Sequence, residues 1–344
     1  MAMLTSDFDY HLPQHLIAQS PAQPRDSSRL LVLDRKSGSM EHSLFRQLPG
    51  HLREGDLLVL NDSRVVPARL LGQRKSTGGR VELLLLHRLH GTTWKALGRP
   101  ARALRLGGIV LVEGAKGTAG EARVLEHWDD GTCAVELEPE VAVLAAGHTP
   151  LPPYIHQLPD DPGDYQTVYA RHDGSAAAPT AGLHFTDALL QDLTDRGIRL
   201  AYVTLHVGAD TFRPVSGEAP ESHKLHGEFF QVSRETADEL NAAREEGRRI
   251  VGVGTTSTRV LEQLGQLAGD GPVQPTDGWA HIYILPGHAF RLTDAMITNF
   301  HLPRTTLLMM ISAFAQRDLV LKAYAEAIRR EYRFYSFGDA MLIL

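Results

Sequence analysis

Residues 249–259 read Arg249-Ile-Val-Gly-Val-Gly-Thr-Thr-Ser-Thr-Arg259, a short apolar run followed by a glycine and four hydroxyl-bearing residues. The run Arg249–Val253 predicts a buried strand, and Gly254–Ser257 leads into a helix expected from Thr258. A strand that passes directly into a helix is the repeating unit of an α/β fold. The segment therefore predicts an α/β body with a mostly parallel or mixed sheet.

The same alternation of strand and helix continues on both sides of this segment. Helices are expected over 187–196, where Thr186 serves as N-cap, over 234–246, where Ser233 does, and over 305–315 and 318–331. Strands are expected over 56–60, 198–207 and 282–285. In such folds ligands bind at the carboxyl ends of the strands, so we look there for candidate site residues.

The region between residues 65 and 149 has a different texture. Short apolar runs broken by glycine, such as Gly108-Ile-Val-Leu-Val and Cys133-Ala-Val-Glu-Leu, favour an antiparallel sandwich or small barrel. We therefore expect residues 1–64 and 150–344 to form the α/β body, and residues 65–149 to form an inserted antiparallel β-barrel. Pro150-Leu-Pro-Pro is the expected return hinge.

The composition narrows the class of protein. The 344 residues are 43% hydrophobic and 22% charged, and no apolar run approaches the ~18 residues of a membrane span. The amino-terminal segment lacks a basic stretch followed by an apolar one, so we expect a cytoplasmic protein without a membrane partner. Cys133 is the only cysteine, which excludes an internal disulfide, a cysteine zinc site and an iron–sulfur cluster.

Charge is unevenly distributed in this chain of net charge −6. Between residues 64 and 105 the only acidic residue is Glu82, and the ten basic ones are Arg64, Arg69, Arg74, Lys75, Arg80, Arg88, Lys95, Arg99, Arg102 and Arg105. A solvated basic face and a polyanion site are both consistent with such a run.

Three histidines stand where an apolar run meets a backbone-breaking residue: His184 in Leu-His-Phe-Thr, His206 in Leu-His-Val-Gly and His301 in Phe-His-Leu-Pro. A histidine at the tip of a strand or helix lies at a cleft rim, where its pKa is tuned near neutrality. A satisfied core histidine or a capping residue is the alternative for each. Their shared pattern indicates one site assembled from distant loops.

The loop Gly254–Ser257 is a candidate anion cradle, because a helix amino terminus offers free N–H groups and a positive dipole end. Helix capping by Thr256 or Ser257 is the alternative. Neither a P-loop nor a dinucleotide fingerprint is present, and no His pair has metal-ligand spacing. Carboxylates near chain breakers are Asp9, Asp62, Asp210, Glu228 and Asp339, and spacing alone does not say which of them meet.

Long blocks of the chain, in order, carry a resemblance to a known family. They include Leu60-Asn-Asp-Ser-Arg-Val-Val-Pro-Ala-Arg-Leu, Ala178-Pro-Thr-Ala-Gly-Leu-His-Phe-Thr, Val203-Thr-Leu-His-Val-Gly, Val253-Gly-Thr-Thr-Ser-Thr-Arg, Ile297-Thr-Asn-Phe-His-Leu-Pro and Tyr332-Arg-Phe-Tyr-Ser-Phe-Gly-Asp. Nearly end to end, the chain resembles the S-adenosylmethionine:tRNA ribosyltransferase-isomerases of queuosine biosynthesis. It departs from that pattern at Asp210, Leu225 and Gly227, where many relatives carry glycine, methionine and serine.

The resemblance implies an activity and its substrates. The ribosyl unit of S-adenosylmethionine, a co-substrate, would pass to 7-aminomethyl-7-deazaguanine at the tRNA wobble position, giving epoxyqueuosine, adenine and methionine. No catalytic cofactor or metal is implied, and a monomer is expected. The chemistry of this reaction suits His184, His206 and His301 for proton transfer, and Thr180, Gly182, Gly208, Gly254, Thr255, Thr256, Ser257 and Arg259 for binding S-adenosylmethionine. The excess of basic residues in the insert makes Arg69, Arg74, Lys75, Arg80 and Arg88 the expected contacts with tRNA phosphate.

Two alternatives belong to other classes. A glycine-rich loop after a strand also suits an S-adenosylmethionine methyltransferase, which would release S-adenosylhomocysteine in place of adenine. A basic barrel also suits an RNA-binding protein without catalytic activity, which would not turn over substrate.

Overall fold

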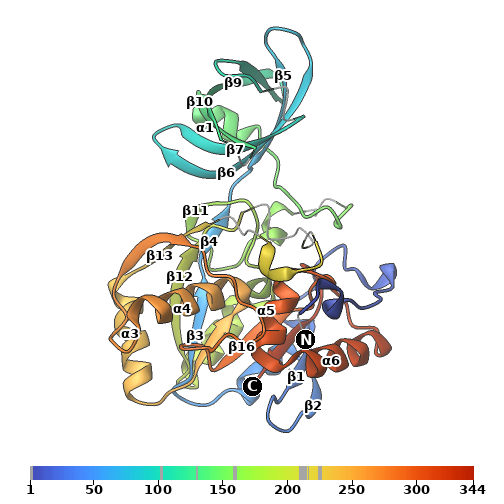
Figure 1. The fold of residues 1–344 in the computed structure, drawn as a ribbon, viewed down its shortest axis with the longest axis vertical. Helices are drawn as coiled ribbons and strands as arrows, with labels where there is room; N and C mark the ends of the chain where they lie inside the picture. The colour runs from blue at the N-terminus through green and yellow to red at the C-terminus, as the bar shows by residue number, and fades with distance from the viewer. Residues whose placement is uncertain are drawn as a thin grey trace.

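A computed structural model describes residues 3–100, 104–128, 131–157, 161–208, 215, 217–223 and 227–344. Figure 1 shows a body of mixed helices and strands with a smaller barrel standing above it, joined by the two chain segments that leave and re-enter the body. This arrangement matches the expected fold of an α/β body with an inserted antiparallel barrel.

A nine-stranded mixed sheet forms the centre of the body. In spatial order its strands are β15 (Thr276–Ala280), β13 (Glu228–Val232), β12 (Arg199–Leu205), β3 (Leu57–Asn61), β14 (Ile250–Val253), β16 (Ala295–Asn299), β17 (Ala340–Ile343), β1 (Arg29–Leu33) and β2 (Met40–Leu44). The central strands β12, β3, β14 and β16 are parallel, so their carboxyl ends share one edge. That edge faces the barrel (Figure 1).

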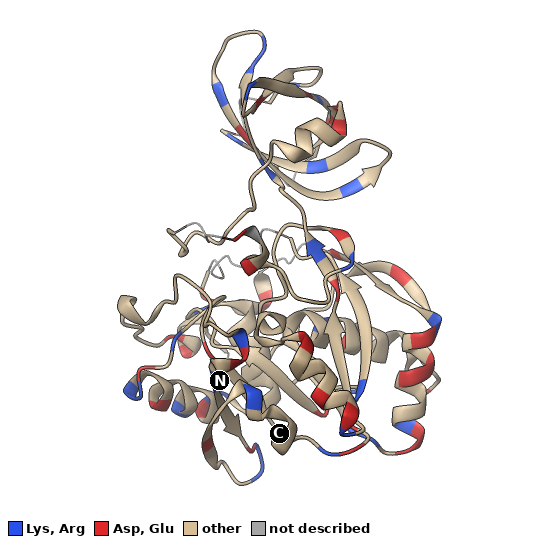
Figure 2. Cartoon of the chain, turned by 180° about the vertical axis from the view of Figure 1, so that it is seen from behind, with Lys and Arg blue, Asp and Glu red and all other residues tan. Residues whose placement is uncertain are grey.

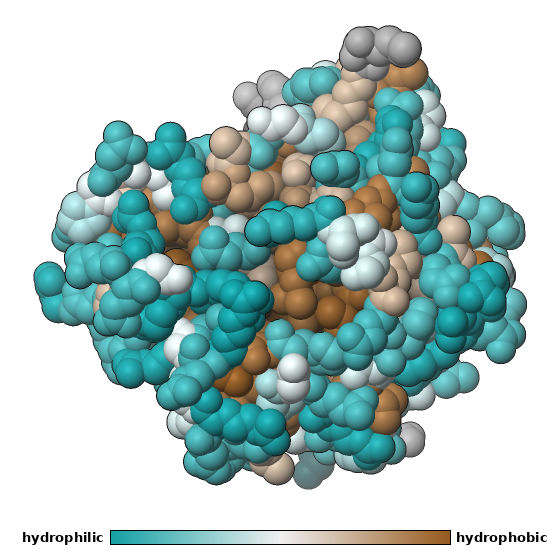
Figure 3. Space-filling view, turned by 90° about the horizontal axis from the view of Figure 1, so that it is seen from below, coloured by the Kyte–Doolittle hydropathy of each residue, from teal (hydrophilic) through white to brown (hydrophobic). Residues whose placement is uncertain are grey.

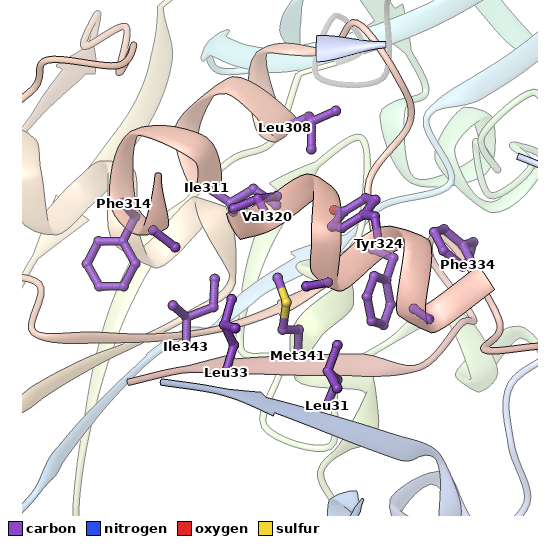
Figure 4. Close-up of a cluster of buried hydrophobic side chains, with 14 of the residues drawn as sticks. Leu31, Leu33, Leu308, Ile311, Phe314, Val320, Tyr324, Phe334, Met341 and Ile343 are labelled. Atoms are coloured by element: carbon purple, nitrogen blue, oxygen red, sulfur yellow. The ribbon is translucent and has the colours of Figure 1, made fainter. Parts of the chain in front are cut away.

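Helices cover the sheet because successive side chains of each strand point to opposite faces. On one face, α3 (Arg234–Glu245) and α4 (Gly254–Ala268) pack on β12–β14, and α5 (Thr306–Ala315) and α6 (Arg317–Arg329) pack on β1 and β17. Figure 4 shows the second contact, where Ile311, Phe314 and Val320 face Leu33 and Ile343. The other face packs on α2 (Asp187–Asp195).

The barrel has its own closed hydrophobic core. Its strands, in spatial order, are β10 (Thr132–Glu138), β7 (Thr93–Arg99), β6 (Arg80–His90), β5 (Arg69–Arg74), β8 (Ile109–Gly114) and β9 (Gly117–His127). The helix α1 (Glu140–Ala145) packs on β9 and β10. We propose that these elements form the inserted unit expected at residues 65–149. Below it, β4 (Ser63–Val65) pairs with β11 (His172–Ser175) in the body.

Most of the elements expected from the sequence are present, including the caps. The hydroxyl oxygens of Thr186, Ser233 and Thr305 accept from backbone N–H groups of the first turns of α2, α3 and α5. Two expectations are wrong. Residues 282–285 are not a strand, because Ile282 and Ile284 alternate inward to contact Met310 without entering a ladder. The helix expected from Thr258 begins at Gly254 instead.

Two further features concern helix length and the surface of the body. No helix in the described part of the chain is long and apolar enough to cross a membrane. Figure 3 views the body from the end away from the barrel, where apolar residues gather in hollows framed by hydrophilic ones.

Candidate active site

A cavity that opens to solvent lies at the carboxyl ends of β14 and β16. The residues that line it are Tyr154, Ala178, Thr180, Ala181, Val207, Gly254, Thr255, Thr256, Thr298, Asn299, Phe300, His301, Leu302, Thr305, Leu307, Tyr335 and Ser336. These residues come from segments spread from Tyr154 to Ser336 in sequence. The cavity is thus assembled from loops at the strand edge where α/β sheets bind ligands.

The first turn of α4 forms one wall of the cavity. Gly254, Thr255 and Thr256 line it, and Gly254 has a φ of 87°, which a side chain would strain. The hydroxyl oxygens of Thr256 and Ser257 are buried and have no hydrogen-bond partner among the described residues. Since buried polar groups are nearly always satisfied, this wall offers hydroxyl and N–H groups to a ligand.

His301 is the only one of the three singled-out histidines that lines the cavity. Its Nε2 lies 2.7 Å from Oγ1 of Thr298, and its backbone N–H donates to the hydroxyl of Tyr324 at 2.8 Å. Its carbonyl accepts from the hydroxyl of Tyr10. Burial lowers the pKa of His301 to about 3, so the imidazole is neutral near pH 7.

His184 lies behind the cavity wall, so the expectation that it stands at the rim is wrong. The residue is 4% exposed and its ring stacks on Phe45 at 4.8 Å. Nε2 accepts from Nδ2 of Asn299 at 3.1 Å, and Nδ1 lies 2.8 Å from Oγ of Ser28. Oδ1 of Asn299 in turn accepts from Oγ1 of Thr180 at 2.9 Å. His184 therefore reaches the cavity only through Asn299.

The electrostatics of His184 also differ from expectation. Burial, followed by the charges of Arg333 and Arg25, lowers the pKa of His184 to about 3. A pKa lowered mainly by burial keeps the ring neutral, which agrees with Nε2 accepting the Asn299 amide proton.

His206 lies beside the cavity and faces away from it. Val207, the next residue, lines the cavity, whereas the His206 ring stacks on Phe229 at 6.0 Å. A Cβ on Gly174 would come within 2.9 Å of the His206 ring, so β11 closes over it. Burial, followed by the charge of His172, lowers the pKa of His206 to about 4.

Arg259, expected to bind a substrate carboxylate, does not line the cavity. It forms a buried ion pair with Glu228, and Glu228 Oε1 also accepts from the backbone N–H of Gly208 at 2.8 Å. Gly182 does not line the cavity either; a Cβ there would lie 2.0 Å from the hydroxyl oxygen of Tyr169. Of the eight residues expected to bind S-adenosylmethionine, Thr180, Gly254, Thr255 and Thr256 line the cavity.

Three of the basic residues expected to contact tRNA are neutralised by carboxylates from later strands or from α1. Arg69 pairs with Glu82, Lys75 with Glu121 at 2.6 Å, and Arg88 with Glu140 at 2.7 Å. Residues 65–149 hold eleven Lys or Arg and nine Asp or Glu. Figure 2 accordingly shows acidic residues beside basic ones on the barrel. The excess of basic residues between 64 and 105 is therefore largely balanced by carboxylates that the folded barrel brings beside them.

Arg74 and Arg80 have no carboxylate partner among the described residues of the barrel, which distinguishes them from Arg69, Lys75 and Arg88. Arg74 also borders an opening at one end of the barrel, together with Arg105. These arginines are the better candidates for contact with phosphate groups.

Sequence reasoning missed several cavity residues. Asn299 and Thr298 stand in the quoted segment Ile297-Thr-Asn-Phe-His-Leu-Pro, but only His301 was singled out. A polar pair directly after a buried apolar strand was the available signal. Tyr335 lines the cavity with a φ of 71°, an uncommon value outside glycine that no sequence pattern disclosed.

The carboxylates named from the sequence, and the positions at which the chain departs from the family pattern, lie away from the cavity or outside the described residues. None of the described carboxylates lines the cavity: Asp9 pairs with Arg304, Asp62 accepts from Thr204, and Asp339 accepts from the backbone of Arg29. Asp210 and Leu225 lie outside the described residues. A Cβ on Gly227 would lie 2.5 Å from Cε1 of His281, so a serine there requires that ring to move.

The last two findings concern metal binding and the family to which the sequence is similar. Within the described ranges, no three His, Cys, Asp or Glu side chains come together as ligands of a metal ion. Residues 5–343 match the model of a family described as queuosine biosynthesis protein.

Relatives of known name are similar over the whole chain. The S-adenosylmethionine:tRNA ribosyltransferase-isomerase of Symbiobacterium thermophilum is 51% identical over 349 residues, covering 99% of this chain and 100% of that protein. The protein of the same name from Dehalococcoides mccartyi strain CBDB1 is 50% identical over 343 residues, with 99% and 100% covered. The crystal structure of S-adenosylmethionine tRNA ribosyltransferase from Thermotoga maritima is 40% identical, with 98% and 100% covered and a TM-score of 0.58.

Proposed function

The chain belongs to the queuosine biosynthesis protein family, and from this membership we propose the reaction that it catalyses. It transfers and isomerises the ribosyl unit of S-adenosylmethionine onto 7-aminomethyl-7-deazaguanine at the tRNA wobble position. The products are epoxyqueuosine-tRNA, adenine and methionine. Its relatives' names support an enzyme of the transferase and isomerase class acting on S-adenosylmethionine and tRNA.

The observation that carries the proposal is the wall of unsatisfied polar groups at the start of α4. A methionine carboxylate placed there would accept from the free N–H groups of the first turn and from the hydroxyl of Thr256, which lines the cavity. The positive end of the helix dipole favours that negative charge. Arg259 contributes by holding α4 through Glu228, and does not itself contact the carboxylate.

The chemistry begins with loss of a proton from the ribose 5′ carbon beside the sulfonium. The carbanionic electron pair then drives opening of the ribose with departure of adenine, and the amine of the tRNA base captures the sugar. Closure of the epoxide breaks the bond to sulfur and releases methionine. Proton transfers of this kind need positioned, neutral bases, and a general base typically contributes a factor of about 10²–10⁴.

Among the three histidines, His301 is best placed for such a transfer, because it alone of the three lines the cavity. His184 acts through Asn299, whose amide it orients toward Thr180 and the cavity. His206 supports the loop that carries Val207. We thus assign proton transfer to His301 and positioning to His184, whereas the sequence had placed all three histidines in proton transfer.

The test is product analysis. Incubation with S-adenosylmethionine and tRNA carrying the aminomethyl-deazaguanine base should release adenine and methionine in equal amounts. S-adenosylhomocysteine in their place would show a methyltransferase. Tight tRNA binding without any turnover would show an RNA-binding protein without catalytic activity.

A further inference from the structure

An aromatic pair lies on the outer strands of the large sheet. Phe229 on β13 is the direct cross-strand partner of Trp279 on β15, and their rings are 5.8 Å apart. Their neighbours in sequence, Phe230 and Ala280, point to the opposite face and join the core beneath α3 and α4. Trp279 lies on the edge strand and is 41% exposed. The pair is thus an apolar surface outside that core.

This pair extends toward both the barrel and the cavity. His87 on β6 of the barrel meets Trp279 edge to face, with ring centroids 4.6 Å apart. On the other side, Phe229 lies parallel to His206 at 6.0 Å and 14°. His206 precedes Val207, which lines the cavity, so the aromatic row ends beside the candidate active site without entering it.

Polar and cationic groups flank the row. Lys95 is the cross-strand partner of His87, and its charge lies near that ring. A groove of mixed charge shares the same face of β13; Arg171, Tyr202 and Gln231 line it, with Arg171 stacked over Tyr202 at 4.8 Å, and so do the carboxylates of Asp62, Glu235 and Glu239. Partly exposed aromatic rings on a sheet, with cations beside them, are how single-stranded RNA bases and phosphates are bound.

We propose that Phe229 and Trp279 form a stacking surface for an unpaired nucleobase of the RNA substrate, beside the nucleotide that enters the cavity. This inference rests on the proposed function, because it takes the macromolecular substrate to be RNA. The alternative is that Trp279 only holds the barrel against the body through His87. Under that alternative, replacing Trp279 loosens the contact between barrel and body but does not remove a contact with an RNA base.

The test combines affinity with fluorescence. The probe is an RNA stem-loop with unpaired loop bases, compared with a blunt duplex of the same stem. Trp279→Ala should bind the stem-loop roughly tenfold or more weakly, as expected for loss of one stacked base. Trp279→Phe keeps a π face and should bind within a few-fold of the parent. Leu267→Ala, at another exposed apolar residue on α4 across the sheet, is the matched control and should bind normally.

Fluorescence separates stacking from a structural role. The stem-loop should quench the parent's tryptophan emission, and Trp279→Phe should bind without that quench; the duplex should produce little quench in either. The KM for S-adenosylmethionine should be unchanged in all three variants. Stem-loop affinity within twofold of the parent in Trp279→Ala overturns the proposal, and so does a parallel weakening for S-adenosylmethionine.

Failure of this inference is distinct from failure of the function. If the parent releases adenine and Trp279→Ala binds RNA normally, stacking is excluded and the proposed reaction stands. If the parent releases no adenine but its emission is quenched and Trp279→Ala weakens binding, the surface stands and the reaction is wrong.

Discussion

Replacement of His184 by alanine tests whether this residue supports the site from behind. The change removes two hydrogen bonds, to Ser28 and Asn299, each worth about 1 kcal/mol. It also removes the stack on Phe45, worth about 1 kcal/mol, and leaves a cavity costing about 1 kcal/mol more. We expect a loss of roughly 4 kcal/mol, which for a chain of this length lowers Tm by about 6 °C.

The assay pairs thermal unfolding with turnover. His301→Ala is the comparison, because that residue lines the cavity and its ring makes one hydrogen bond, to Thr298. It should cost only about 1 kcal/mol of stability while lowering turnover by about a hundredfold or more. His184→Ala should lose more stability than His301→Ala and less turnover. Its loss of turnover should arise from a displaced Asn299.

A double-mutant cycle decides whether Asn299 is the intermediary. If His184 acts through the Asn299 amide, the effects of His184→Ala and Asn299→Ala on turnover should be strongly non-additive. Additive effects would refute the connection, and so would a His184→Ala variant as stable as the parent. Full exchange of the ribose 5′ hydrogens with deuterated water in His184→Ala, after correction for folding, agrees with the positioning role. Its loss in His301→Ala identifies the base.

Three further predictions concern charge, pH and packing. Neutralising Arg74 and Arg80 together should reduce the salt dependence of tRNA binding by a slope of roughly 2, measured by titration at several salt concentrations, with the KM for S-adenosylmethionine unchanged; an unaltered slope identifies a solvated face. The pKa values of His184 and His301 are lowered to about 3 in the folded state, so the unfolded chain binds more protons below pH 6.5, and stability should fall as pH drops from 6.5 toward 3. At pH 5 each of these two histidines lowers the free energy of unfolding by about 2 kcal/mol relative to neutral pH. In urea unfolding, the stability of His184→Ala should therefore depend less steeply on pH than that of the parent. Gly182→Ala should lower Tm, since its Cβ would lie 2.0 Å from the Tyr169 hydroxyl oxygen; an unchanged Tm contradicts that packing.

The sequence predicted the central architecture because local signals and tertiary packing agree there. The caps at Thr186 and Ser233 are chemical requirements of helix ends, so they are visible without a structure. The segment 282–285 failed for the opposite reason. Its alternating apolar residues fit a strand, but alternation reports burial on one side and not the presence of a ladder partner.

The site was less predictable than the fold, because the identity of a residue does not say what it faces. His184 and His301 follow the same local pattern, yet one lies behind Asn299 and the other lines the cavity. The basic run failed for a related reason. Its carboxylate partners Glu121 and Glu140 lie outside the window counted, and only closure of the barrel brings them alongside.

Arg259 shows how a residue outside the cavity sets its shape. Glu228 receives the Arg259 guanidinium from α4 and the backbone N–H of Gly208 from the loop after β12. One carboxylate thus joins the helix whose first turn lines the cavity to the segment that contributes Val207. Because both partners of the ion pair are buried, removal of either leaves an uncompensated charge, which costs about 3–5 kcal/mol. The pair therefore fixes two walls of the cavity relative to one another, and under the proposed function the helix terminus, not Arg259, would receive the substrate carboxylate.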